Sequence, residues 1–247
     1  MAACFLGLDL AWADTNPSGL AALDERGTLV DVCADRRSDA DVLAWVRAHA
    51  GERGAIAIDM PTIVANASSQ RACERELRAD FQDARTPPGG RAAALLDALR
   101  DDGVVHACDV APHDARTVAF ETYPHAAAVA LFGLARITKH KKKPRRSWDA
   151  VLAAWAAYRA HLETLRAAEP PLAVDAAHLP VAVNERRYKR WDDSIDAILC
   201  AYVASYVWHH GTASGRVRVY GDMARGHIVV PQRSHVKRAP GGYTAGV

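Results

Sequence analysis

Three acidic residues come directly after short, mostly apolar segments, a pattern that can build a metal site. Asp9, Asp59 and Glu121 each end a segment that predicts a buried strand. Carboxylates are costly to bury unpaired, so several of them at one edge of a sheet need a cation to hold them together. Mg²⁺ and Mn²⁺ prefer such oxygen ligands. Any one of these acids alone is explained equally well as a turn cap, and it is the set of three that indicates a metal site.

A fourth acidic element lies near the C-terminus, where Asp193 and Asp196 fall on a predicted helix. Residues three apart share one face of a helix, so the two carboxylates are expected to lie together. Capping explains Asp192 or Asp193 taken alone, because an acid in the first turn suits the helix dipole. It explains Asp196 less well, since Asp196 is flanked by Ile195 and Ile198. Which of the two acids faces the metal stays open, with Asp196 favoured.

A dense basic run covers residues 139–146. Lys139, Lys141, Lys142 and Arg145 in this run could hold a phosphate backbone. A solvated surface loop is an equally good interpretation of the run taken alone. Nucleic acid is therefore an expected partner, with DNA and RNA both open.

Short strands are expected to position the acids. Turn sequences separate residues 5–10, 20–23 and 28–33, which predicts three antiparallel strands. Residues 55–59 follow a helix and are expected to pair in parallel with a neighbour, because a strand–helix–strand connection makes a crossover. Residues 117–121 form a further strand.

Amphipathic spacing and capping residues predict the helices. Ser38 is a fitting N-cap, with Asp41 three residues on. The predicted helices cover residues 39–49, 72–80, 91–100, 126–134, 147–166 and 192–209. A terminal hairpin is expected from residues 217–220 and 227–230.

Composition narrows the class of protein. The chain has 247 residues, of which 50% are apolar and 24% charged, and this is typical of a folded chain. It has no apolar run long enough to span a bilayer and no signal peptide, so we expect no membrane contact. Its five scattered cysteines predict reduced thiols, which favours a cytoplasmic protein. We expect one domain over residues 1–247, with an insertion at about 62–90 and a loose tail at about 233–247.

Several motifs together resemble one known family. They are Gly7-x-Asp9-x-Ala11-Trp12, Pro17-Ser18-Gly19, Ile58-Asp59-Met60-Pro61, Asn66 with Arg71-Ala72-Cys73-Glu74, Glu121-Thr122-Tyr123-Pro124-His125, Asp193-x-x-Asp196-Ala197 and Gly226-x-Ile228-Val229-Val230-Pro231. Because these motifs follow one another in this order, the chain resembles domain-of-unknown-function family 429 (DUF429), whose members are predicted to be RNase H-like nucleases. The resemblance implies an α/β fold with a mixed five-stranded sheet, its first three strands antiparallel, and helices on both faces.

The resemblance also implies a mechanism. Asp9 resembles the first-strand acid that bridges two metal ions, and Asp59 and Glu121 resemble acids of the fourth and fifth strands. Asp193 or Asp196 resembles the acid of the C-terminal helix in Holliday-junction resolvases. The implied chemistry is phosphodiester hydrolysis with two Mg²⁺ or Mn²⁺ ions, one activating water and one stabilising the leaving oxygen.

The residues around these acids have weaker interpretations. Trp12 could stack on a base, although a buried core tryptophan is the commoner case. Asn66, Arg71 and Glu74 match the family motif, which implies that they line the site, while Arg71 and Glu74 alone would be a surface ion pair. His125 could act as a general acid or base, or serve as a helix-capping or core histidine.

Two other functions remain open besides a nuclease. A phosphotransferase of the actin and sugar-kinase kind would follow its first-strand acid with a glycine-rich phosphate turn, whereas Asp9 is followed by the bulky Leu10-Ala11-Trp12. The third possibility is a non-catalytic nucleic-acid-binding module whose acids hold no metal. The complete acidic set argues against that module, and the basic run fits either function.

Overall fold

The computed structural model describes residues 2–13, 16–64, 70–81, 90–175, 177–179 and 188–232. Its centre is a mixed sheet in the order β3-β2-β1-β4-β6-β5. The strands are β1 (Cys4–Asp9), β2 (Pro17–Leu23), β3 (Leu29–Arg36), β4 (Gly54–Ile58), β5 (Val105–His106) and β6 (Thr117–Glu121). Strand β2 pairs antiparallel with both β1 and β3, and β4, β6 and β5 continue the sheet in parallel from β1.

The sheet therefore has six strands within the described residues, and the expectation of five was wrong. The additional strand is β5, which pairs only two residues with the outer edge of β6. Such a short strand has no alternation of apolar and polar residues to reveal it in the sequence. The other strands agree with the predicted segments to within a few residues.

The helices also follow the predicted segments. They are α1 (Asp39–His49), α2 (Ala72–Asp80), α3 (Arg91–Arg100), α4 (Pro124–Leu131), α5 (Trp148–Thr164), continued by a 3₁₀ turn (Leu165–Ala167), and α6 (Tyr188–His210). Ser38 caps α1 as predicted, because its hydroxyl accepts from the Asp41 amide and the Asp41 carboxylate accepts from the Ser38 amide. A hairpin of β7 (Val217–Asp222) and β8 (Gly226–Pro231) follows α6.

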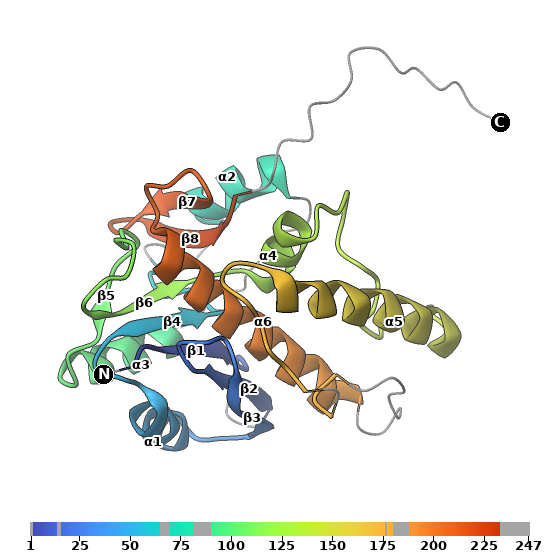
Figure 1. Cartoon of the computed structure of the whole chain (residues 1–247), viewed down its shortest axis with the longest axis horizontal. Helices are drawn as coiled ribbons and strands as arrows, with labels where there is room; N and C mark the ends of the chain where they lie inside the picture. Colours follow the sequence, from blue (N-terminus) through green and yellow to red (C-terminus); the bar gives the residue numbers. More distant parts are fainter. Residues whose placement is uncertain are drawn as a thin grey trace, which may run out of the picture.

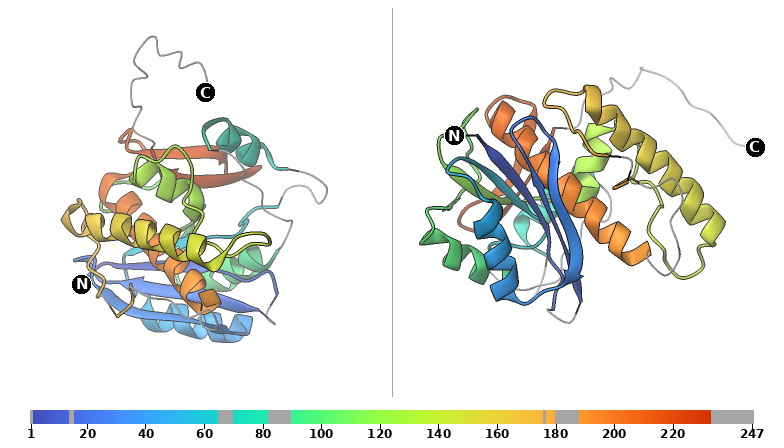
Figure 2. Two further views of the ribbon diagram at one scale, coloured as in Figure 1. Left: turned by 90° about the vertical axis from the view of Figure 1, so that its right-hand side faces the viewer. Right: turned by 60° about the horizontal axis from the view of Figure 1, so that its bottom comes forward.

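The helices cover both faces of the sheet, as Figures 1 and 2 show. Alternate strand residues face opposite layers. Leu6 and Leu8 of β1 pack with α1 and α3, whereas Phe5 packs with α5 and α6. A smaller core joins α2 and α4 to the hairpin β7–β8.

Glycines in β1 and β2 let α6 lie directly on the sheet. A Cβ atom at Gly7 would be 2.0 Å from the carbonyl oxygen of Ala197, and one at Gly19 would be 2.1 Å from that of Asp193. No larger residue fits at either position unless the helix moves away. The glycine of the Gly7-x-Asp9 motif thus brings the N-terminal half of α6 beside the end of β1, where Asp9 lies.

The predicted insertion at 62–90 is described in part and contains α2. The predicted tail at 233–247 lies outside the described residues. None of the helices in the described part of the chain combines the length and apolar character that a membrane span requires.

Candidate functional site

Two neighbouring parallel strands bring Asp9 and Asp59 to the same edge of the sheet. Leu8 pairs with Ile58 in the register of β1 and β4, and the Asp59 amide donates to the Leu8 carbonyl over 2.8 Å. Both acids line a pocket of about 450 Å³, together with Asp193 of α6. The other residues that line it are Leu10, Ala11, Trp12, Asn16, Pro17, Lys141, Lys189 and Asp196. Four of the five predicted acids therefore share one pocket at the carboxyl end of the strands.

Burial and neighbouring carboxylates raise the pKa of two acids of this pocket, Asp9 and Asp59. Burial and the nearby Asp196 raise the pKa of Asp59 to about 8. Burial, Asp196 and Asp59 together raise the pKa of Asp9 well above its ordinary value. A carboxyl group whose pKa is raised by its neighbours is one that lacks enough positive charge around it. The pocket is thus a place where a cation would be stabilised.

Two lysines supply part of that charge. Lys141 pairs with Asp196 and lies 3.8 Å from an oxygen of Asp192, while Lys189 pairs with Asp193. Burial would raise the pKa of Asp196, but Lys141 and nearby histidines bring it below its ordinary value. Asp192 is a member of this group that the sequence prediction placed only in a helix cap, and its position directly before Asp193 was the available signal.

The unpartnered carboxylate oxygens of Asp193 and Asp196 in α6 indicate whether the pocket suits a divalent cation. The side chains of Asp193 and Asp196 are 5% and 4% exposed. Asp193 Oδ2 and Asp196 Oδ1 have no hydrogen-bond partner among the described residues. Unsatisfied carboxylate oxygens beside two further acids are a donor set that suits Mg²⁺ or Mn²⁺. As the side chains stand, no three His, Cys, Asp or Glu side chains in the described ranges form a metal site, so cation binding would require the acids to turn toward the ion.

Glu121 lies in a different group. The guanidinium of Arg71 donates to both of its carboxylate oxygens, at 2.5 and 2.8 Å, and the Thr62 amide donates at 3.0 Å. Arg71 Nε also donates to Glu74 over 2.9 Å. All three charged side chains are buried, so the surface ion-pair interpretation of Arg71 and Glu74 was wrong. We call Arg71, Glu74 and Glu121 the sealed group.

The sealed group supports the strand end that carries Asp59. Besides binding Glu121, Arg71 donates to the Ile63 carbonyl over 3.1 Å, and the Thr122 amide donates to the Ile58 carbonyl over 2.9 Å. The chain on both sides of Asp59 is therefore fixed. Burial raises the pKa of Glu121 while Arg71 opposes that shift. All three hydrogen bonds use the carboxylate as acceptor, which fits an ionised Glu121.

Trp12 lies at the pocket with an exposed side chain. It is 44% exposed and lines the pocket three residues after Asp9. The interpretation as a core tryptophan was therefore wrong. An exposed indole beside a polar pocket is suited to stacking on a flat ring.

The basic run forms a loop, as predicted, but only one of its lysines enters the pocket. Lys141 lines the pocket, whereas Lys139, Lys142 and Arg145 are exposed outside it. Lys142 lies over the ring of Trp148, 5.3 Å from its centre.

His125 is the second residue of α4 and lies near enough to Lys141 and Asp196 of the pocket for their charges to affect its pKa. Its pKa is lowered to about 4 by burial and by Lys141, so the ring is neutral near pH 7. Tyr123 Oη lies 3.4 Å from its Nδ1. Asn66, the remaining candidate, lies outside the described residues.

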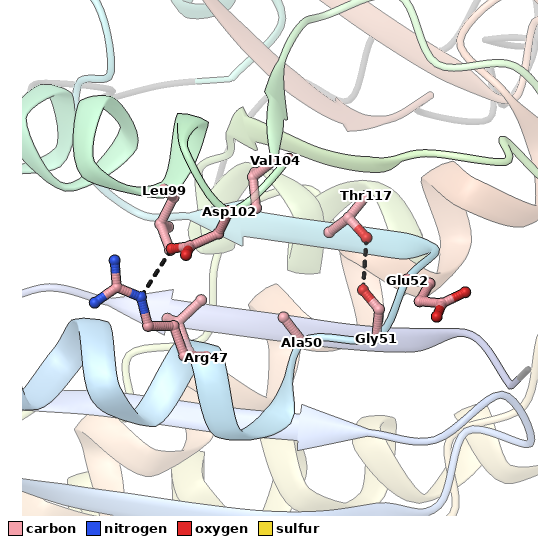
Figure 3. A pocket seen from close by; sticks show the side chains of 10 residues that line it. Arg47, Ala50, Gly51, Glu52, Leu99, Asp102, Val104 and Thr117 are labelled. Carbon is pink, nitrogen blue, oxygen red and sulfur yellow. Dashed lines mark hydrogen bonds and ion pairs between the residues drawn. The ribbon is translucent and has the colours of Figure 1, made fainter.

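A second pocket lies at the opposite, amino end of β4 and β6 (Figure 3). Its polar groups bind one another: Arg47 pairs with Asp102 over 2.8 Å, and Thr117 donates to the Gly51 carbonyl over 2.8 Å. The acidic side chains of its lining are Glu52 and Asp102. This pocket lacks the crowding of acids that distinguishes the pocket at Asp9.

Comparison with known proteins gives one match. The family model described as "Protein of unknown function (DUF429)" matches residues 7–224, and the chain belongs to this family. Neither the curated proteins nor the solved structures gave a significant match.

Proposed function

We propose that this protein is a Mg²⁺- or Mn²⁺-dependent phosphodiesterase that hydrolyses nucleic acid at the pocket of Asp9, Asp59, Asp193 and Asp196. One observation carries the proposal: acids from two adjacent strand ends and from α6 line a single pocket, with buried carboxylate oxygens left unpartnered among the described residues. Such a donor set needs a hard cation.

The arrangement of the sheet supports an RNase H-like fold for this nuclease. Its first three strands are antiparallel, and helices cover both faces. Acids at the ends of β1 and β4 and on α6 occupy the places that the resemblance implies. The departure is Glu121, which the sealed group holds, so we assign it to support rather than to the metal.

The reaction would be hydrolysis of a phosphodiester. The oxygen of a water molecule bonds to phosphorus, the ester P–O bond breaks, and the leaving oxygen takes up a proton. A bound Mg²⁺ or Mn²⁺ would supply a Lewis acid that polarises the phosphate and activates the water. Asp9, Asp59 and the unpartnered oxygens of Asp193 and Asp196 would hold the cation. Lys141 would bind phosphate oxygens, and Trp12 would stack on a base.

A non-catalytic nucleic-acid-binding module is the second candidate. Lys141 and Lys189 each pair with an acid of α6, which gives those acids counterions without a metal. A phosphotransferase is disfavoured, because the bulky side chain of Trp12 lines the pocket where a glycine-rich phosphate turn would be required.

Single- and double-stranded DNA and RNA oligonucleotides with Mg²⁺, Mn²⁺ or EDTA test the proposal. We expect cleavage of at least one substrate by the wild type with metal and none with EDTA. Asp9→Asn, purified in parallel, should abolish cleavage while the protein stays folded. Lys143→Met, a change at an exposed lysine of the basic run, is the matched control. Binding without cleavage, unaffected by metal or by Asp9→Asn, would favour the binding module.

A further inference from the structure

Lys141 is held in the pocket by its neighbour in the sequence. His140 is buried and stacks on Tyr158, with the ring centres 4.2 Å apart. Thr138 Oγ1 lies 2.8 Å from His140 Nδ1, and the Tyr188 hydroxyl donates to the His140 carbonyl. The backbone of the loop is therefore anchored directly beside Lys141, unlike that of a freely solvated basic run.

The ammonium group of Lys141 lies among acids. It pairs with Asp196 and is 3.8 Å from Asp192 Oδ2. Its side chain is 26% exposed, whereas that of Lys189, the other lysine of the pocket, is 71% exposed. A lysine with an anchored backbone and a largely buried stem has little freedom to leave, so Lys141 is a resident part of the site.

The two acids of α6 that line the pocket, Asp193 and Asp196, each bind a lysine through one oxygen and leave the other oxygen without a partner among the described residues. Asp196 binds Lys141 through Oδ2, and its Oδ1 is buried without a partner among the described residues; Asp193 binds Lys189 through Oδ1, and its Oδ2 is likewise unpartnered. Asp192 Oδ1 is also buried without a partner among the described residues, but Asp192 does not line the pocket. Within the pocket, the oxygens left for a metal are therefore these two and those of Asp9 and Asp59. A cation held by them would leave the pairing of Lys141 with Asp196 Oδ2 in place.

We propose that the pocket binds a single divalent cation per chain and that Lys141 takes the place of a second one. This inference rests on the proposed function and changes one feature of it, since the resemblance implies two metal ions. An ammonium group has three N–H donors, so Lys141 can hold Asp196 and still donate to a phosphate oxygen. There it stabilises the negative charge that develops as the ester P–O bond breaks.

The number of bound ions tests this inference without an activity measurement. Free Mn²⁺ is followed by electron paramagnetic resonance as the metal-free protein is titrated, and circular dichroism confirms that each variant is folded. We expect one bound Mn²⁺ in the wild type and one in Lys143→Met. Lys141→Met should bind two, because it releases the oxygens of Asp192 and Asp196 to a second ion.

Two bound ions in the wild type would overturn the inference and leave the proposed function intact. One ion in Lys141→Met would also overturn it, because Lys141 would then not occupy a cation position. No bound Mn²⁺ in the folded wild type would instead contradict the proposed function itself. The three failures are therefore distinguishable.

Discussion

Two groups of buried acids lie close together in this molecule and are balanced in different ways. In the sealed group, one guanidinium binds both oxygens of Glu121 and one of Glu74. In the pocket, acids on two strand ends and α6 outnumber the lysines, and the pKa of Asp59 rises to about 8. The sealed group satisfies its carboxylates and the pocket does not.

This difference distinguishes acids that stabilise the fold from acids that are suited to binding a cation. A planar guanidinium matches a carboxylate at two points and leaves it no need for another cation. A group of acids with unsatisfied oxygens destabilises the fold, and such clustering is typical of functional sites. The comparison therefore supports a structural role for Glu121 and our proposal of cation binding for Asp9 and Asp59, although all three acids lie at strand ends of one sheet.

The largest effect is expected from breaking the sealed group. Arg71→Met leaves Glu74 and Glu121 buried without their cation, and the free energy of unfolding should fall by about 3–5 kcal/mol. Urea denaturation measures it. Arg75→Met, a change at an exposed arginine of α2, the helix that begins directly after Arg71, should alter it by less than about 0.5 kcal/mol. A small loss in Arg71→Met would mean that the sealed group does not stabilise the fold.

Glu121→Gln is a milder change that distinguishes a structural role of Glu121 from a role in metal binding. Glu121→Gln weakens charge-assisted hydrogen bonds to Arg71, so the free energy of unfolding should fall by about 1.5–3 kcal/mol. Its affinity for Mn²⁺ should change only a few-fold, because Arg71 already holds both carboxylate oxygens of Glu121. Complete loss of Mn²⁺ binding by folded Glu121→Gln would return Glu121 to the metal site.

Trp12 tests the pocket as a surface for bases. Trp12→Ala should weaken binding of a single-stranded oligonucleotide by about 1–3 kcal/mol, and Trp12→Phe should weaken it less. The thermal midpoint should hardly change, because the side chain is 44% exposed. Fluorescence anisotropy with a labelled oligonucleotide in EDTA measures the affinity. Equal binding by Trp12→Ala would exclude stacking.

The crowded acids also predict a pH dependence for the metal-free protein. An aspartate of the unfolded chain has a pKa of about 3.9, whereas that of Asp59 is raised to about 8 by burial and Asp196. The folded state therefore binds the proton more tightly, and stability falls as the pH rises from about 4 to about 8. His125 and His140, both with pKa values lowered to about 4 by burial, act in the opposite direction, but only below about pH 6.5.

Between pH 6.5 and 8 the fall should be on the order of 1 kcal/mol per pH unit. Chemical denaturation in EDTA at several pH values measures it, and Asp59→Asn should flatten the curve. At pH 8 this variant should be more stable than the wild type, because it removes a charge from among like charges. The same slope in both proteins would show that Asp59 is not crowded by its neighbours.

The sequence predicted the strands and the helix that carry the acids of this site better than it predicted the contacts between their side chains. Apolar segments that end in acids predicted Asp9 and Asp59 at one sheet edge, and helical spacing placed Asp193 and Asp196 on one face. Both are local patterns, since strand side chains alternate every two residues and a helix face repeats every three to four residues. The sequence indicated Gly7 only as part of a motif. The need for glycine there comes from close contact with α6, almost 200 residues further along the chain.

The remaining features depend on contacts between distant segments. Arg71 and Glu121 are 50 residues apart, and no local pattern indicates that they pair. Lys141 enters the pocket because its neighbour His140 is buried against Tyr158, which a basic run gives no reason to expect. Trp12 is exposed because the chain leaves the sheet after Asp9, whereas its residue type alone favours the core.

Titration of the metal-free protein with Mn²⁺ in a calorimeter tests the central claim most directly. We expect wild-type protein to bind with a dissociation constant in the micromolar to millimolar range, and folded Asp9→Asn and Asp59→Asn each to lose that binding. Absence of binding by the folded wild type, or binding that neither substitution weakens, would contradict the assignment of this pocket as a cation site.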